Sequence, residues 1–407
     1  MTVGLKDRDR GNAPLDCECD GNYRCEQNPS RATITRKNRA AIHQKGRGRQ
    51  HQKQHKRLVS RNPDRHGPGD SRREPPRARH IGWLFALGWL ILFMTACSII
   101  TAPAVAAPPA PATSIALGTT FLTAQNTASV FTVAWSPNGK YLALGGADGT
   151  VQVRAAATGD VLFTVHGHAN SVWALAWSPD GTHLASASWD NTVRIWNATT
   201  GEHLLTYRGH TGLVLAVAWS PDGIRLASAG SESTVQVWNV TTGRTVYTYR
   251  GHTNTVEALA WSPNGARLAS ASFDHTVQVW DAATGDYALT YRGHTNRVWA
   301  LAWSPGGKYI ASGSEDRTVQ VWKASTGRTS VIYHGHTNGV QAVGWAPDGK
   351  YIASGSWDTT VQVWEAATGH HVFTYHGHSQ LIGSLAWSPD STRIASAADD
   401  VRVWQAS

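Results

Sequence analysis

The chain has 407 residues and a formal net charge of +9. Residues 1–80 hold 20 Lys or Arg and 9 Asp or Glu, whereas the rest of the chain holds 17 and 19, so the basic surplus lies in the N-terminal part alone. Nucleic-acid binding would therefore have to depend on that part. No cysteine follows Cys97, which excludes a disulfide framework or a thiol site from residues 98–407.

Residues 1–80 are rich in Arg, Lys, Gln and Asn and have almost no hydrophobic run. Such a segment buries too little apolar surface to offset its chain entropy, so we predict a basic disordered tail. Residues 50–57 would suit nonspecific contact with phosphates, although a solvated tail is the simpler interpretation. A further hypothesis is that translation starts later in the chain. Cys17, Cys19 and Cys25 form only a weak metal pattern, because no fourth ligand is near.

Residues 81–101 carry no charge and, as a helix, would span roughly 30 Å. Four arginines precede this segment within ten residues, and no Lys or Arg follows before Lys140. The asymmetry predicts a single transmembrane or signal-anchor helix with a cytoplasmic N-terminus and an extracytoplasmic C-terminal part.

The end of this helix, Met94-Thr95-Ala96-Cys97, resembles the lipobox of bacterial lipoproteins, although Met94 stands where Leu is usual. Processing there would make Cys97 a lipidated N-terminus; without processing the helix would be a permanent anchor, and both outcomes tether the protein. Residues 102–115 are rich in Ala and Pro and predict an extended linker.

A Gly-His pair recurs every 42 residues in the remaining part of the chain, and a fixed period in this range indicates a repeat architecture. The pairs are Gly167-His168, Gly209-His210, Gly251-His252, Gly293-His294, Gly335-His336 and Gly377-His378. One period earlier stands Gln125-Asn126, which indicates a degenerate first copy.

One period contains four short strand patterns separated by turn sequences such as Ser178-Pro179-Asp180-Gly181. The predicted strands are Val172–Trp177, Leu184–Ser188, Thr192–Trp196 and His203–Tyr207. Four antiparallel strands per repeat are typical of a propeller blade.

The two ends of the chain indicate how the ring closes. The last copy stops after a third strand, Val401–Trp404, while Thr119–Ala124 occupies a fourth-strand position ahead of the first copy. We therefore predict an all-β, seven-bladed β-propeller over residues 116–407, with its last blade completed by the N-terminal strand.

These residues resemble the WD40-repeat family over about residues 119–405, in a bacterial-type, membrane-anchored form. The resemblance rests on the Gly-His pairs, the Trp-Ser-Pro-Asp/Asn-Gly turns and the Trp that ends each third strand. The literal Trp-Asp dipeptide occurs once, at Trp280-Asp281. The resemblance implies a propeller that binds proteins rather than an enzyme.

The resemblance also implies a buried hydrogen-bond network of His, Ser, Asp and Trp inside each blade. The matching sets are His168, Ser186, Asp190, Trp196; His252, Ser270, Asp274, Trp280; His294, Ser312, Asp316, Trp322; and His336, Ser354, Asp358, Trp364. Three copies depart from the pattern. One has Glu232 in place of Asp, the last is two residues short near Asp399-Asp400, and the first has Leu144 and Arg154 in place of Ser and Trp. We expect this first blade to be the weakest.

The His-Ser-Asp sets resemble a catalytic triad in composition only, since they recur once per blade as a structural network would. No cluster of Cys or carboxylate residues accompanies the His-X-His pairs to complete a metal site. The sequence also has no phosphate-binding glycine loop. We expect no catalytic site, no metal, no cofactor and no small-molecule substrate.

Function is expected where the copies differ. In WD40 propellers two sequence columns ring one mouth of the channel: the residue after the Val that opens each first strand, and the residue before the blade Asp. The predicted partner-binding rim consists of Phe131, Trp173, Trp189, Glu257, Phe273, Arg297, Trp299, Glu315 and Trp357. Exposed aromatics beside charges are typical of interaction hot spots, but these rings could equally pack flat on neighbouring blades.

Taken together, the sequence predicts a protein-interaction scaffold displayed on the outer face of a membrane, which binds an unidentified protein or peptide. Two alternatives remain open. One is a cytoplasmic scaffold whose basic tail contacts nucleic acid, and the other is an extracytoplasmic propeller enzyme.

Overall fold

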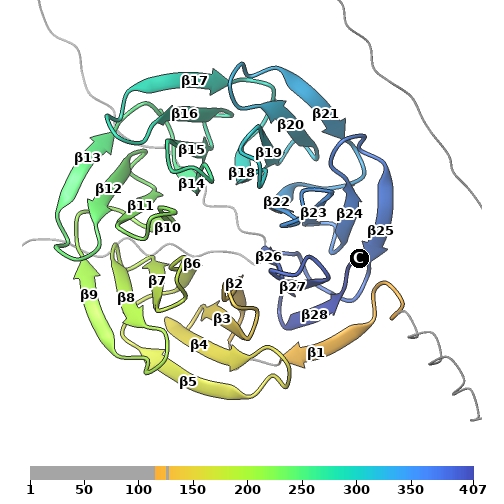
Figure 1. Cartoon of the computed structure of the whole chain (residues 1–407), viewed down its shortest axis with the longest axis horizontal. Coiled ribbons are helices and arrows are strands. Elements are labelled where there is room, and N and C mark those ends of the chain that lie inside the picture. Colours follow the sequence, from red (N-terminus) through yellow and green to blue (C-terminus); the bar gives the residue numbers. More distant parts are fainter. Residues whose placement is uncertain (1–114, 125–127) are drawn as a thin grey trace, which may run out of the picture. The chain divides into compact units, whose positions relative to one another are not determined.

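The computed structural model describes residues 115–124 and 128–407. They form 28 strands in seven four-stranded antiparallel sheets, arranged as a ring (Figure 1). The predicted all-β, seven-bladed propeller is thus confirmed. The predicted tail, the 81–101 helix, Cys97 and most of the linker lie outside the described residues. Within the described ranges, no helix is long and apolar enough to cross a membrane.

The first four blades follow the chain in order. Blade 1 contains β2 (Val130–Trp135), β3 (Tyr141–Gly146), β4 (Thr150–Ala155) and β5 (Val161–His166). Blade 2 contains β6 (Val172–Trp177), β7 (His183–Ser188), β8 (Val193–Asn197) and β9 (His203–Tyr207). Blade 3 contains β10 (Val214–Trp219), β11 (Arg225–Gly230), β12 (Val235–Asn239) and β13 (Thr245–Tyr249). Blade 4 contains β14 (Val256–Trp261), β15 (Arg267–Ser272), β16 (Val277–Asp281) and β17 (Tyr287–Tyr291).

The last three blades complete the ring, and only blade 7 combines the two ends of the propeller. Blade 5 contains β18 (Val298–Trp303), β19 (Tyr309–Ser314), β20 (Val319–Lys323) and β21 (Thr329–Tyr333). Blade 6 contains β22 (Val340–Trp345), β23 (Tyr351–Ser356), β24 (Val361–Glu365) and β25 (His371–Tyr375). Blade 7 contains β26 (Ser384–Trp387), β27 (Arg393–Ala397), β28 (Val401–Gln405) and β1 (Thr120–Ala124).

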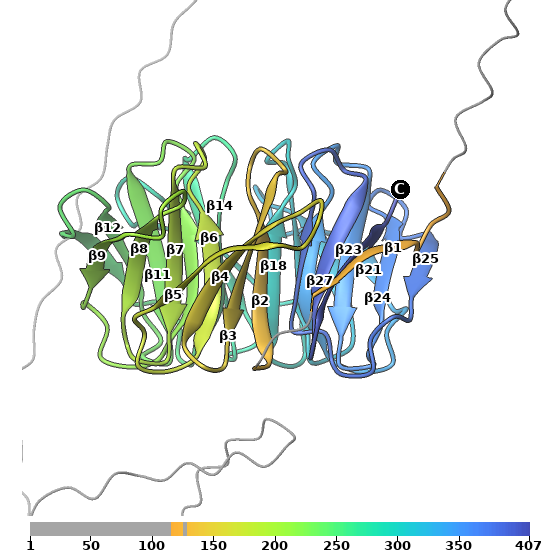
Figure 2. The same cartoon turned by 90° about the horizontal axis from the view of Figure 1, so that it is seen from below.

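The first strand of each blade lies next to the central axis and the fourth lies at the periphery (Figure 1). In the side view of Figure 2 the strands run across the thickness of the ring, so the two ends of a first strand reach opposite faces. A residue at the start of a first strand therefore lies at one channel mouth, and the Trp-Ser-Pro turn lies at the other. The residues that follow the opening position of each first strand therefore lie at one mouth of the channel.

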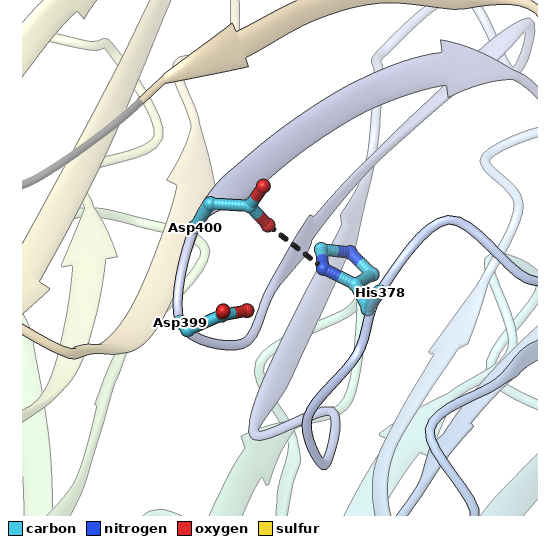
Figure 3. A group of neighbouring side chains, drawn as sticks. All are labelled: His378, Asp399 and Asp400. Carbon is cyan, nitrogen blue, oxygen red and sulfur yellow. Dashed lines mark ion pairs between the residues drawn. The ribbon is translucent and has the colours of Figure 1, made fainter.

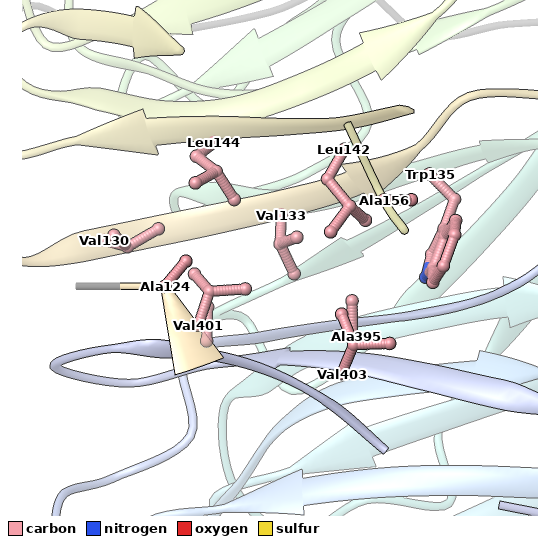
Figure 4. Packing of buried hydrophobic residues seen from close by; sticks show 11 residues of the cluster. Ala124, Val130, Val133, Trp135, Leu142, Leu144, Ala156, Ala395, Val401 and Val403 are labelled. Atoms are coloured by element: carbon pink, nitrogen blue, oxygen red, sulfur yellow. The ribbon is translucent and has the colours of Figure 1, made fainter. Parts of the chain in front are cut away.

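The ring closes where the sequence predicted. β1 pairs antiparallel with β28, with Thr123 opposite Arg402 and Ala124 opposite Val401. Buried residues of blades 1 and 7 form a shared apolar cluster behind this pairing, as Figure 4 shows for Val130, Leu142 and Val403. The strand pairing and the cluster together leave no unpaired sheet edge at the junction of the two ends.

Neighbouring blades are also joined by polar contacts that repeat around the ring. In five of the seven blades the Trp that ends the first strand donates its indole N–H to a carbonyl of the preceding blade, for example Trp177 to Ala134 at 3.2 Å and Trp303 to Ala260 at 2.9 Å. In the outer part of the ring, the Tyr291 hydroxyl donates to Gln320 Oε1 of the next blade at 2.5 Å and its ring stacks on Trp322. These hydrogen bonds satisfy buried polar atoms across the blade interfaces, so the blades that form them depend on their neighbours.

Candidate binding site at the channel mouth

The predicted network is present inside blade 2 with short hydrogen bonds. His168 is buried, with Nδ1 2.8 Å from Asp190 Oδ2 and Nε2 2.7 Å from Ser186 Oγ. Trp196 donates its indole N–H to the same Ser186 hydroxyl at 2.8 Å. Asp190 also accepts the backbone N–H of Ala169, and thereby fixes the loop that leads into the first strand. The network therefore positions the mouth of the channel, not a reacting group.

Two of the departing copies keep a carboxylate beside the buried imidazole, as a hydrogen bond in blade 3 and as a close contact without hydrogen-bond geometry in blade 7. Glu232 Oε1 lies 2.7 Å from His210 Nδ1, and its second oxygen accepts both the N–H and the hydroxyl of Thr211. In blade 7, Asp400 Oδ1 lies 2.9 Å from His378 Nδ1 (Figure 3). A longer side chain or a shifted carboxylate thus still lies next to the same imidazole.

Two copies lack part of the network. In blade 4, His252 contacts Asp274 and Ser270, but the Trp280 indole nitrogen has no partner among the described residues. In blade 1, Leu144 is fully buried where other blades have Ser, and Arg154 donates to Gln152 Oε1 and Gly159 O. The predicted departure of blade 1 is thus a real loss of the buried polar chain.

The network carboxylates are held in the ionised form. Burial alone would raise the pKa of Asp358, but the hydrogen bonds from His336 and Thr360 outweigh burial and keep its pKa below the usual range. The same balance lowers the pKa of Asp190, Glu232, Asp274 and Asp316. In blade 7 the burial of His378 lowers the pKa of its imidazole. These shifts indicate stabilising contacts, since each carboxylate only accepts hydrogen bonds.

In blade 7 a second carboxylate lies close to the network. Potential ligand atoms of His378, Asp399 and Asp400 lie within 4.8 Å of one another (Figure 3). However, Asp399 is exposed and Arg402 donates to Asp400 Oδ2 at 2.9 Å, so a cation already balances this carboxylate. We assign no metal to this group.

The first sequence column does line the channel. A cavity of about 190 Å³ is bounded by the residues that follow the opening position of each first strand: Phe131, Trp173, Leu215, Glu257, Trp299, Gln341 and Gly383. Each blade contributes one of these side chains or, at Gly383, a backbone position. The column therefore makes a continuous wall whose composition changes from blade to blade.

The predicted rim aromatics gather in two groups. In blades 1 and 2, Phe131, Trp173 and Trp189 contact one another with ring centroids 5.0–6.2 Å apart. We call these three residues the first aromatic group. All are half-buried, which favours the alternative that the rings pack on neighbouring blades: the side chains pack on one another across two blades.

The second aromatic group consists of Phe273, Trp299 and Trp357, from blades 4, 5 and 6. Trp299 lies edge-on to both other rings, at 4.6 and 5.4 Å between centroids. Arg297, 48% exposed, places its guanidinium 5.0 Å from the Phe273 ring and 3.9 Å from the Glu315 carboxylate. The charged rim residues are therefore paired with each other at the edge of an aromatic surface.

Glu257 differs from the other predicted rim residues. Its side chain is buried in the channel, with 8% of the residue exposed, and Oε1 accepts the indole N–H of Trp173 at 2.7 Å. Burial raises the pKa of Glu257 to about 7, against the opposing effect of the Trp173 hydrogen bond. The sequence placed Glu257 in the correct column, but it did not show that the carboxylate would be desolvated.

Sequence reasoning missed two contributors to this mouth. Gln341 lines the cavity and accepts the Trp357 indole N–H at 2.6 Å, which ties the second aromatic group to the channel wall. The indole nitrogens of Trp189 and Trp299 are buried and have no hydrogen-bond partner among the described residues. Gln341 could have been found from its position after the opening residue of the first strand. The unpartnered indole nitrogens could not, because they result from side-chain packing alone.

The family models agree with this architecture. The model described as WD domain, G-beta repeat matches residues 159–197, 201–239, 243–281, 285–323, 327–365 and 369–404, and these segments cover more than half of the chain. The chain therefore belongs to the WD40-repeat family of β-propellers, which are generally non-catalytic scaffolds that bind proteins.

Each matched segment joins the outermost strand of one blade to the three inner strands of the next, as residues 159–197 do with β5 and β6–β8. A second model, described as Anaphase-promoting complex subunit 4 WD40 domain, matches residues 118–173 and so includes the degenerate first copy. No curated protein matches the chain.

Proposed function

We propose that the protein is a membrane-displayed interaction scaffold that binds a protein or peptide at the channel mouth lined by Phe131, Trp173, Glu257 and Trp299. The supporting observation is that non-repeated residues concentrate at this mouth, whereas the network that repeats from blade to blade is satisfied internally. Two half-buried aromatic groups beside a paired Arg and Glu offer the rigid, partly desolvated contacts that dominate binding energies.

Affinity capture with matched variants tests this proposal. Trp357→Ala removes a ring of the second aromatic group, and Trp189→Ala removes a ring of the first. The matched control is Tyr287→Ala, because Tyr287 is 60% exposed on the peripheral strand of blade 4. We expect both mouth variants to lose the partner that the wild type and the control retain. Retention of the same partner by both mouth variants would contradict the assignment of the mouth.

Display at a membrane is the second part of the proposal. It is supported by the uncharged segment 81–101, the arginines that precede it and the sequence around Cys97. A protease-protection assay on sealed membrane vesicles of known orientation tests it: we expect the propeller to be accessible from the extracytoplasmic side only. A propeller degraded only from the cytoplasmic side would support the cytoplasmic alternative.

A further inference from the structure

The channel mouth combines a buried carboxylate with aromatic walls, and this combination defines the chemistry of a ligand. Glu257 lies in a cavity whose lining includes the rings of Phe131, Trp173 and Trp299. Leu215, Gln341 and Gly383 supply no opposing charge, so Glu257 is the one ionisable group among the residues that line this cavity.

The Glu257 carboxylate is incompletely satisfied. Oε1 accepts the Trp173 indole N–H at 2.7 Å, whereas Oε2 makes no hydrogen bond within the described residues and, because it is not among the fully buried unpartnered atoms, is accessible to a ligand. Burying a carboxylate costs free energy unless a donor or a cation compensates it. An acceptor of this kind at the opening of a cavity is suited to a ligand that carries a positive charge.

Nearby strands do not provide that charge. β10 and β18, which pack against β14 on either side, carry no ionisable side chain. β11 and β15 carry Arg225 and Arg267 at the ends of the strands remote from Glu257, and these guanidinium groups donate to the carbonyls of Ala282 and Ala324. Arg297, the one cation of the predicted rim, lies over Phe273 and beside Glu315.

The aromatic rings that line the cavity also favour a positively charged ligand. Aromatic faces attract ammonium and guanidinium groups within about 6 Å of the ring centroid. The side chain of a lysine or arginine supplies such a group. The cavity of about 190 Å³ is smaller than the roughly 300–1,000 Å³ of sites for drug-sized ligands.

We propose that the channel mouth binds one basic side chain, lysine or arginine, of a partner peptide, with its cationic group at Glu257. This inference rests on the proposed function and specifies its ligand. Insertion would replace the missing partner of Glu257 Oε2 and place the cation among the rings of Trp173, Trp299 and Phe131.

Synthetic peptides test the inference with the full-length protein. The probes are acetyl-Gly-Ala-X-Ala-Gly-amide peptides in which X is lysine, arginine or the neutral isostere norleucine, measured by saturation-transfer NMR and titration. We expect the lysine or the arginine peptide, or both, to bind, and the norleucine peptide to bind at least tenfold more weakly. The comparison of lysine with arginine identifies which cation the site prefers. Equal binding of norleucine, or no binding of either basic peptide, would overturn the inference.

Variants locate the site. Glu257→Gln keeps an acceptor for Trp173 and removes the charge, so we expect at least a tenfold loss of affinity for the basic peptide. The matched control, Glu202→Gln, changes an exposed residue in the turn between β8 and β9 and should leave affinity unchanged. Undiminished binding by a folded Glu257→Gln protein would overturn the inference.

The wild type supplies an independent test that requires no variant. A cation binds the ionised carboxylate, so affinity should rise as the pH passes upward through the Glu257 pKa of about 7 and level off above it. Between pH 6 and pH 8 we expect about a tenfold increase, since the ionised fraction rises from roughly a tenth to nine-tenths. Affinity that is constant or falls over this range contradicts the role of Glu257. If these tests fail while the aromatic variants still lose their partner, the proposed function stands and the cationic ligand is rejected.

Discussion

Individual carboxylates have opposite roles in this propeller. Asp358 accepts four hydrogen bonds, from His336, Thr337 and Thr360, and therefore stays ionised. Glu257 accepts one, from Trp173, and burial raises its pKa to about 7. Satisfied charges of the first kind support the fold, whereas an unsatisfied charge of the second kind is expected at a binding site.

Asp358→Asn tests the structural role at this scale. Every hydrogen-bond partner of Asp358 is a donor, so the NH2 group of Asn would face another N–H or O–H donor. We therefore expect the unfolding free energy to fall by about 1–3 kcal/mol. Urea unfolding at pH 7 measures the loss. The exposed Asp286→Asn provides the control and should change little. Equal stability of the two variants would show that the network contributes nothing net.

The same variant gives a pH dependence. The folded-state pKa of Asp358 lies below that of the unfolded chain, so its contribution is complete above the unfolded pKa of about 4 and disappears as the pH falls toward the folded value. The difference in stability between wild type and Asp358→Asn should therefore be constant from pH 5 to 7 and shrink below pH 4. A difference that grows on acidification would contradict this explanation.

At the scale of strands and blades, blade 1 is the exception. Leu144 replaces the network Ser, and the blade relies on an apolar cluster shared with blade 7. We predict that β3 exchanges its amide protons faster than the equivalent strand β15 of blade 4, because β15 retains the His252, Ser270 and Asp274 contacts. Hydrogen exchange with mass spectrometry compares the two strands directly. Equal protection would show that ring closure fully replaces the network.

Most of the strands and their pairing could be predicted from the sequence, because a repeat period specifies both where the strands lie and how they align. The four strands of blade 2 were predicted to within one residue, and Thr119–Ala124 was correctly expected to complete the last blade. The register also placed Glu257 and Trp173 in one column. It could not show that they touch, since that contact crosses two blades and 84 residues and depends on the curvature of the whole ring.

For a similar reason, the sequence could not decide whether the rim aromatics are exposed or packed on neighbouring blades. Phe131 and Trp189 belong to different columns and different blades, and their contact is set by how closely neighbouring first strands approach the axis. Glu232 departs from the pattern in sequence but keeps the contact with His210, because the additional methylene lets its carboxylate reach the same imidazole.

At the scale of the whole molecule, closure depends on β1. Leu122 is half-buried, packs against the cluster shared by blades 1 and 7, and lies next to Gly159 of blade 1. Leu122→Asp should therefore lower the unfolding free energy by about 1–3 kcal/mol. The control, Leu162→Asp, alters a residue that is 51% exposed on the peripheral strand β5. Thermal unfolding with equal midpoints for both variants would refute a role for β1 in closing the ring.

The central claim is that partners bind at the mouth formed by the starts of the first strands. Site-specific photocrosslinking in cells tests it most directly, with a photoreactive amino acid introduced at Arg297 beside the mouth or at Lys350 in the exposed turn that follows β22 at the opposite end. The account predicts a partner adduct at position 297 and none at position 350. An adduct at position 350 alone would contradict it.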